Sequence, residues 1–201
     1  MEHWERVYTT KGADQVSWYA RHLDASLGLI ERATISRRSK VIDVGAGTST
    51  LVDDLLGRGF EDLTVLDISH KAVDVCRDRL GKEAERVHWI TADVTKIELE
   101  SCQFDVWHDR AVFHFLTAPA DRIAYVRQVK RSVRVGGHVI VATFGPEGPK
   151  RCSGLDVVRY DSDSLHHEFG PRFRLLESSQ IVHRTPSGTA QQFLYCYCVL
   201  E

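Results

Sequence analysis

The sequence has no long hydrophobic run and few of the residues that build special scaffolds. No stretch of about 18 apolar residues occurs, which argues against a membrane-spanning helix. The first residues also lack the basic-then-apolar layout of a secretion signal. The five cysteines form no C-x-x-C pair, so neither a disulfide framework nor a tetrahedral zinc site is indicated. We therefore expect a cytoplasmic protein with no membrane contact and no metal ion.

An excess of either charge is also missing. Lys and Arg number 26 against 28 Asp and Glu, giving a net charge of −2. Dedicated nucleic-acid binding normally requires a clear basic excess, so we do not expect it here. With 43% hydrophobic and 27% charged residues, the 201-residue chain has a globular composition, and we expect a single domain over 1–201. The sequence leaves the oligomeric state open.

Short apolar runs alternate with helix-length segments along most of the chain. These runs are rich in β-branched and aromatic residues and lie at 40–44, 63–67, 87–91, 104–107 and 138–143. Continuous runs of this kind are typical of strands that are covered on both faces. The alternation predicts an α/β fold with a mostly parallel sheet. The runs 175–183 and 191–199 flank a Pro- and Gly-containing turn, which predicts a closing β-hairpin with an antiparallel last strand.

Two helices have clear end signals. A helix over 69–80 is expected to begin after the capping residue Ser69 and to end before Gly81. A second is expected to begin at Pro119, to continue its apolar face as far as Val133, and to stop at 136–137, where two glycines follow each other.

The most informative segment is a glycine turn that joins the first apolar run to a helix. Gly45 and Gly47 allow a sharp turn and a close approach of a ligand to the main chain. Thr50 stands where a dinucleotide-binding loop would carry its third glycine, and Asp43 precedes the turn. A carboxylate at this point would repel a pyrophosphate and attract an ammonium group.

Acidic residues also follow the next two strands. Asp67 ends the second run at the position where ribose hydroxyls are bound in such folds, and Asp93 follows the third run, where it can accept from an adenine amine. For each acid alone, a capping role at a strand end is the ordinary alternative. Together with the glycine turn, they predict a nucleoside ligand that carries a cationic amine and no phosphate.

These residues resemble the class I S-adenosylmethionine-dependent methyltransferases, whose cofactor loop has the pattern D/E-x-G-x-G. The resemblance implies a Rossmann-like sheet of seven strands in the order 3-2-1-4-5-7-6, with helices on both faces. It divides the chain into an N-terminal helical cap (1–36), a cofactor-binding core (38–145), and a lid loop with the closing hairpin (146–201). The cofactor-binding residues that it implies are Asp43, Gly45, Ala46, Gly47, Asp67, Ile68, Asp93, Val94 and Trp18.

The segment after the fourth strand faces the reactive methyl group in this family. Here it contains His108 or Asp109 as a candidate base or orienting group, and Arg110 as a candidate anion-binding group. The alternative is that Asp109 and Arg110 form a structural ion pair while His108 only packs.

The residues expected to bind the methyl acceptor lie outside the cofactor motif. The opening W-x-x-x-Y pattern of Trp4 and Tyr8 resembles that of lysine and thiol methyltransferases, in which this segment folds over the cofactor. We expect both to line the substrate site together with His114, Arg151 and Cys152. These residues favour a small-molecule acceptor such as a thiol, since a thiolate is present near neutral pH. The alternatives are a protein lysine methyltransferase, an NAD-dependent oxidoreductase, and a non-catalytic binding module with the same fold.

Overall fold

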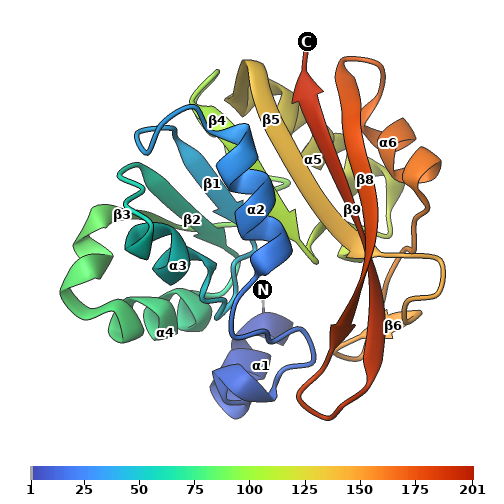
Figure 1. The fold of residues 1–201 in the computed structure, drawn as a ribbon. Helices are drawn as coiled ribbons and strands as arrows, with labels where there is room; N and C mark the ends of the chain where they lie inside the picture. Colours follow the sequence, from blue (N-terminus) through green and yellow to red (C-terminus); the bar gives the residue numbers. More distant parts are fainter. Residues whose placement is uncertain (1) are drawn as a thin grey trace.

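The main structural element is a single seven-stranded sheet with helices on both faces (Figure 1). The computed structural model describes residues 2–201. The helices are α1 (Glu2–Thr10), α2 (Asp24–Ala33), α3 (Leu51–Gly57), α4 (His70–Leu80), α5 (Pro119–Ser132) and α6 (Ser162–Phe169), with short 3-10 helices η1 (Ala13–Gln15), η2 (Gly81–Arg86) and η3 (Phe113–Phe115). The strands are β1 (Val41–Val44), β2 (Leu63–Asp67), β3 (Val87–Thr91), β4 (Phe104–Arg110), β5 (Val133–Phe144), β6 (Arg151–Cys152), β7 (Leu155–Asp156), β8 (Phe173–Arg184) and β9 (Ala190–Leu200).

The strand order confirms the predicted topology. The sheet runs β3-β2-β1-β4-β5-β9-β8, and β6 and β7 form a separate two-stranded hairpin. Strands β1 to β5 pair in parallel, whereas β9 is antiparallel to both β5 and β8. Because β1 lies between β2 and β4, Asp43 lies opposite Val65 on one side and His108 on the other. This register brings residues from distant parts of the chain to one edge of the sheet.

Two apolar clusters cover the two faces of the sheet. On one face, Leu27 and Ile30 of α2 and Leu51 and Leu55 of α3 are buried in one cluster. On the other face, a second cluster joins side chains of α5 and α6 to those of β4, β5 and β9. Alternating strand residues contribute to both clusters, as expected for a sheet that is buried on both sides.

The end signals of two helices are confirmed, and one boundary prediction is wrong. The Ser69 hydroxyl caps α4 by accepting from the Ala72 N–H at 3.1 Å, and Gly81 follows the helix with a φ of 56°. Pro119 is the first residue of α5. However, α5 ends at Ser132, and Val133 already belongs to β5. The two glycines at 136–137 therefore do not stop the helix. They lie within β5, where its pairing with β4 shifts register.

The N-terminal segment separates into two parts with different positions. Helix α2 packs against the sheet beside β4 and β5. Helix α1 instead projects at the carboxyl edge of the parallel strands and lies against α4 (Figure 1). The Glu5 carboxylate of α1 accepts from the backbone N–H groups of His70 and Lys71 at 2.5 and 3.2 Å. A negative charge at the first turn of α4 is favourable there. Of these two helices, α1 is the one that covers the strand ends.

Candidate functional site

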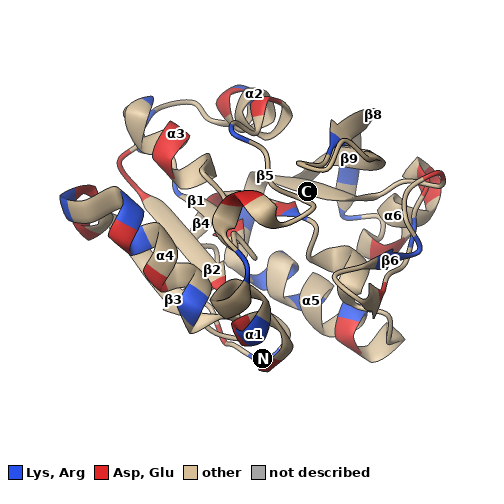
Figure 2. Cartoon of the chain, turned by 90° about the horizontal axis from the view of Figure 1, so that it is seen from below, with Lys and Arg blue, Asp and Glu red and all other residues tan. Residues whose placement is uncertain are grey.

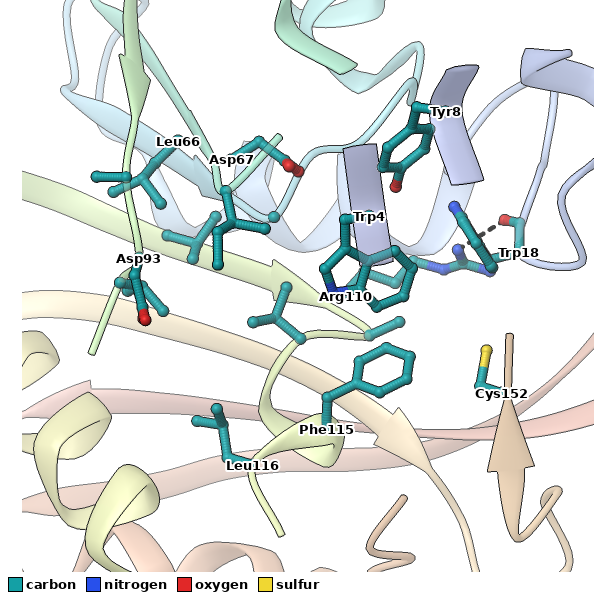
Figure 3. Close-up of a pocket in the computed structure, with 17 residues that line it drawn as sticks. Trp4, Tyr8, Trp18, Leu66, Asp67, Asp93, Arg110, Phe115, Leu116 and Cys152 are labelled. Carbon is teal, nitrogen blue, oxygen red and sulfur yellow. Dashed lines mark hydrogen bonds between the residues drawn. The ribbon is translucent and has the colours of Figure 1, made fainter. Parts of the chain in front are cut away.

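A cavity lies at the carboxyl ends of β1, β2, β3 and β4, on the side covered by α1 (Figure 3). Figure 2 views the molecule from this edge, with α1 projecting toward the reader. The cavity has two chemically different halves. The acidic half is formed by Leu66, Asp67, Ile68, Asp93 and Val94. The aromatic half is formed by Trp4, Tyr8, Trp18 and Phe115, together with Arg110 and Cys152.

The glycine turn forms the floor between the two halves. Gly45 and Gly47 have φ values of 65° and 56°, a region that side-chain-bearing residues rarely adopt. A Cβ atom at Gly45 would overlap the side chain of Val112, and one at Gly47 would overlap the hydroxyl of Tyr8. Both positions therefore require glycine for the backbone conformation and also for the close packing above it.

Asp67 ties the glycine turn to the end of β2. Its carboxylate accepts from the backbone N–H of Gly47 at 2.7 Å and from that of Ser69 at 2.8 Å. Burial raises the pKa of Asp67 to about 6, and the hydrogen bonds from the backbone oppose this shift. The side chain lines the cavity, so its carboxylate is available to a ligand with hydroxyl groups.

Asp93 follows β3 by two residues and is more open to solvent. It accepts from the Thr95 N–H at 3.0 Å and from the Thr95 hydroxyl at 2.6 Å, and it pairs with Lys96 at 2.9 Å. Partial burial acts to raise its pKa, but the hydrogen bonds from Thr95 and the contact with Lys96 together lower it. The structure thus places Asp67 and Asp93 in the same half of one cavity, as the strand-end spacing predicts.

Asp43 lies in a smaller adjoining cavity. That second cavity is lined by Asp43, Ala46 and His108, and it shares Gly45, Trp18 and Arg110 with the first. The Asp43 carboxylate contacts His108, with 2.7 Å between Oδ1 and Nδ1. A ligand that spans both cavities would pass over Gly45, the point where the two cavities meet.

The three candidate catalytic residues have different surroundings. His108 is buried, and both of its ring nitrogens are hydrogen-bonded, to Asp43 and to Ser26. Asp109 is also buried and lies outside both cavities. Its carboxylate accepts from the Val112 N–H, the Phe113 N–H and the Tyr125 hydroxyl at 2.8, 3.0 and 2.6 Å. Burial raises the pKa of Asp109 to about 6.

Arg110 alone of these three lines the larger cavity. Its guanidinium donates to the backbone oxygen of Trp18 at 2.9 Å and lies over the ring of Phe193, 4.4 Å from the ring centre. Within residues 2–201 it forms no ion pair with Asp109, so the suggested structural ion pair between these neighbours is wrong. The reason is that adjacent strand residues point to opposite faces of the sheet. Asp109 faces α5, and Arg110 faces the cavity.

The aromatic half is assembled from four separate segments of the chain. Trp4 contacts Phe115 and Trp18 edge-to-face, with ring centres 5.0 and 5.8 Å apart. Tyr8 stacks on Trp4 at 6.2 Å. Cys152 of β6 closes this half, and burial raises the pKa of its thiol to about 11. Figure 3 shows Trp18 and Cys152 on the opposite side of the cavity from Leu66 and Asp93.

Two candidate substrate residues lie outside the cavity. His114 is completely buried, and its Nδ1 accepts from the Phe144 N–H at 3.1 Å. Burial lowers the pKa of His114 to about 3. Arg151 is exposed and pairs with Asp156 at 3.1 Å. Phe115, in contrast, lines the cavity although no motif singles it out. Its place in an aromatic-rich segment directly after the fourth strand is the one signal that points to it.

Comparison with known proteins relates the chain to one class of enzymes. Residues 41–137 match the family model described as a methyltransferase domain. A solved structure described as "Conversion of a Disulfide Bond into a Thioacetal Group during Echinomycin Biosynthesis" has the same fold. It superposes with a TM-score of 0.81 at 18% identity and covers 100% of this chain and 92% of that one. The family match and the shared fold together support a class I S-adenosylmethionine-dependent methyltransferase.

Curated relatives act on different acceptors. The eEF1A lysine and N-terminal methyltransferase of Mus musculus is 24% identical over 139 residues, which are 69% of this chain and 20% of that protein. A malonyl-acyl-carrier-protein O-methyltransferase of Paenibacillus sp. is 27% identical over 124 residues, which are 59% of this chain and 44% of that protein. The chain thus spans about a fifth of the length of the mouse relative.

In residues 2–201, no group of three or more His, Cys, Asp or Glu side chains is arranged to hold a metal ion. No helix in the same range is long and apolar enough to cross a bilayer.

Proposed function

We propose that the protein transfers a methyl group from S-adenosylmethionine to a small, uncharged or anionic nucleophile, with a thiol as the preferred acceptor. The observation that carries this proposal is the composition of the aromatic half of the cavity. It is closed by Trp4, Trp18 and Phe115, and among residues 2–201 the one charged side chain that lines it is that of Arg110. Both carboxylates that line the cavity, Asp67 and Asp93, belong to the other half.

The acidic half fits the adenosine part of the donor. The carboxylate of Asp67 would accept from the ribose hydroxyls, and that of Asp93 from the exocyclic amine of adenine. Ile68 and Val94 provide apolar surface for the base. Gly45 lies where the two cavities meet, between this half and the site proposed for the amino-acid end. When bound, S-adenosylmethionine supplies a methyl group that its sulfonium already activates.

The aromatic half would hold the acceptor and exclude water from it. Methyl transfer is an in-line displacement, so alignment and desolvation are the main tasks of the protein. Trp4, Trp18 and Phe115 provide rigid apolar walls at little cost in conformational entropy. Helix α1, which carries Trp4, covers this half from the solvent side.

The absence of a suitable base in the aromatic half supports a thiol. Burial raises the pKa of Cys152 to about 11 and that of Tyr8 well above its ordinary value, so neither takes up a proton near neutral pH. Arg110 is permanently charged. Among residues 2–201, no histidine lines this part of the cavity. A thiol needs little help, because part of it is thiolate near neutral pH, and a guanidinium nearby favours that form.

A protein lysine acceptor is the second candidate, favoured by the name of the mouse relative. A lysine ammonium must lose its proton before it can attack, and carboxylates beside its entrance would help to bind and deprotonate it. The aromatic half offers Arg110 instead, which repels an ammonium group. The composition of this half therefore supports the small acceptor over the lysine.

A methyl-acceptor screen tests the proposal. Purified protein and S-adenosylmethionine labelled in the methyl group are incubated with small thiols, amines and phenols, and separately with a cell lysate. Asp67→Ala serves as the matched control, since its cofactor site is impaired. We expect label in a thiol product with the unaltered protein and little with the variant. Label confined to protein bands would favour the lysine acceptor, and label in no product would contradict the proposed activity.

A further inference from the structure

His108 stands directly opposite Asp43 in the paired strands β4 and β1. The two side chains are in contact, with 2.7 Å between His108 Nδ1 and Asp43 Oδ1. Both are withdrawn from solvent, with side-chain exposures of 1% for His108 and 7% for Asp43. Because a carboxylate only accepts hydrogen bonds, the ring nitrogen that faces Asp43 carries the proton and donates it.

The opposite ring nitrogen is held as well. His108 Nε2 lies 2.8 Å from the Ser26 hydroxyl of α2, and that hydroxyl lies 3.3 Å from the Tyr195 hydroxyl of β9. The imidazole is therefore fixed at both ends, by groups from two different elements, β1 and α2. It does not line the larger cavity, so it cannot reach an acceptor bound there.

The second oxygen of Asp43 remains available. No hydrogen bond within residues 2–201 uses Asp43 Oδ2, although Asp43 lines the second cavity together with Gly45 and Arg110. An oxygen in that position can take an ammonium group.

We propose that His108 is a positioning residue: it fixes the rotation of the Asp43 carboxylate so that the free oxygen faces the ammonium end of the donor. This inference rests on the proposed function. A carboxylate with one oxygen anchored has its remaining acceptor aimed before the ligand arrives, and less conformational freedom is lost on binding. Ser26 and Tyr195 in turn fix the ring that does the anchoring, in the way that outer-shell partners orient metal ligands.

Binding of two adenosine ligands separates this role from a general structural one. S-adenosylhomocysteine carries the amino-acid end, whereas 5′-methylthioadenosine has the same nucleoside without it. We would measure both affinities by calorimetry for the unaltered protein, His108→Leu and His108→Asn. The leucine variant has no donor for Asp43, while the asparagine amide can replace Nδ1. His138→Leu is the matched control, because His138 stacks on Tyr197 in β9 and lines neither cavity.

We expect His108→Leu to weaken S-adenosylhomocysteine binding by about tenfold or more, as for loss of a charge-assisted hydrogen bond, and to leave methylthioadenosine within about twofold. His108→Asn should recover most of the loss, and His138→Leu should change neither affinity. Equal losses for both ligands, or no loss for either in a folded His108→Leu protein, would overturn the inference. If the unaltered protein bound neither ligand, the proposed function itself would fail, and this inference with it.

Discussion

The two halves of the cavity are built in different ways. The acidic half comes from a continuous stretch of chain, in which the strands β1, β2 and β3 end next to one another and Asp67 and Asp93 stand at or just after two of these ends. The aromatic half is assembled from α1, the loop before α2, the segment after β4, and the small β6 hairpin. The strand order of the parallel sheet determines the acidic half, whereas packing between distant segments determines the aromatic half.

The halves also differ in how their polar groups are satisfied. Asp67 is held by backbone N–H groups that belong to the glycine turn and to the start of α4. Arg110 has one hydrogen bond to a backbone oxygen and a contact with an aromatic ring. The acidic half is thus tied by hydrogen bonds to the backbone of the sheet and its adjoining turns. Side chains of the aromatic half can be replaced without breaking such bonds between strands. Mutations in the two halves should therefore have separable effects.

The largest expected effect concerns Asp109, which lies in neither half of the cavity. We expect it to support the stability of the fold and not ligand binding. Asp109→Ala removes a buried acceptor that serves three donors, and we expect a loss of about 3–5 kcal/mol in the free energy of unfolding. Urea denaturation measures this loss. Tyr125→Phe removes one of the three donors and should cost about 1–2 kcal/mol, with S-adenosylhomocysteine affinity unchanged. A clear loss of S-adenosylhomocysteine affinity in a folded Tyr125→Phe protein would indicate that Asp109 takes part in ligand binding.

The next effect tests the acidic half. Asp67→Ala should weaken S-adenosylhomocysteine binding by about 1–3 kcal/mol, because it removes a charged acceptor for the ribose and an anchor of the glycine turn. Calorimetry gives the affinity. Asp62→Ala, one residue before the opposite end of the same strand, is the matched control and should bind normally. Normal binding by Asp67→Ala would show that the ribose is held elsewhere.

A pH profile sharpens the same assignment. Burial raises the pKa of Asp67 to about 6, so the free protein carries a protonated Asp67 below this pH. The ribose hydroxyls need an ionised acceptor, and the affinity for S-adenosylhomocysteine should therefore fall as the pH drops through 6, approaching about tenfold per pH unit. Above pH 7 it should be constant. Asp67→Asn should bind more weakly at pH 7 and should lose this dependence; an identical profile in that variant would assign the titration to another group.

The smallest effect tests the aromatic half. Phe115→Ala should lower kcat/KM for the identified acceptor by about tenfold, since one wall of the acceptor site is lost. Its affinity for S-adenosylhomocysteine should stay within about twofold. The exposed Ile123 of α5 provides a control, and Ile123→Ala should match the unaltered protein in both measurements. A Phe115→Ala protein that loses cofactor affinity and acceptor turnover equally would show that the halves are not independent.

Sequence reasoning was most successful for the acidic half because strand ends and glycine turns follow local rules. Asp67 and Asp93 come together as their spacing predicts, and the signals at Ser69, Gly81 and Pro119 identify helix ends correctly. The error at Val133 has a physical reason. A buried β-branched residue opposite Phe104 favours the strand over another helical turn, and only the pairing of β5 with β4 reveals this.

The aromatic half was predicted less completely. Trp4, Tyr8 and Cys152 do line the cavity, and Trp18, expected among the cofactor-binding residues, lies in this half. His114 and Arg151 lie outside the cavity, although each is adjacent in sequence to a residue that lines it. Adjacent residues point in different directions, and which one faces the cavity depends on packing that no spacing rule describes. The contact between His108 and Asp43 likewise follows from the neighbouring positions of β1 and β4, not from a motif.

The central claim is that the acidic strand ends bind a phosphate-free adenosyl ligand. Calorimetric titration of the unaltered protein with S-adenosylhomocysteine, followed by competition with NAD⁺, tests it most directly. We predict one bound S-adenosylhomocysteine per chain and no competition by NAD⁺, because Asp43 beside the glycine turn would repel a pyrophosphate. Binding of NAD⁺ in place of S-adenosylhomocysteine would contradict the account.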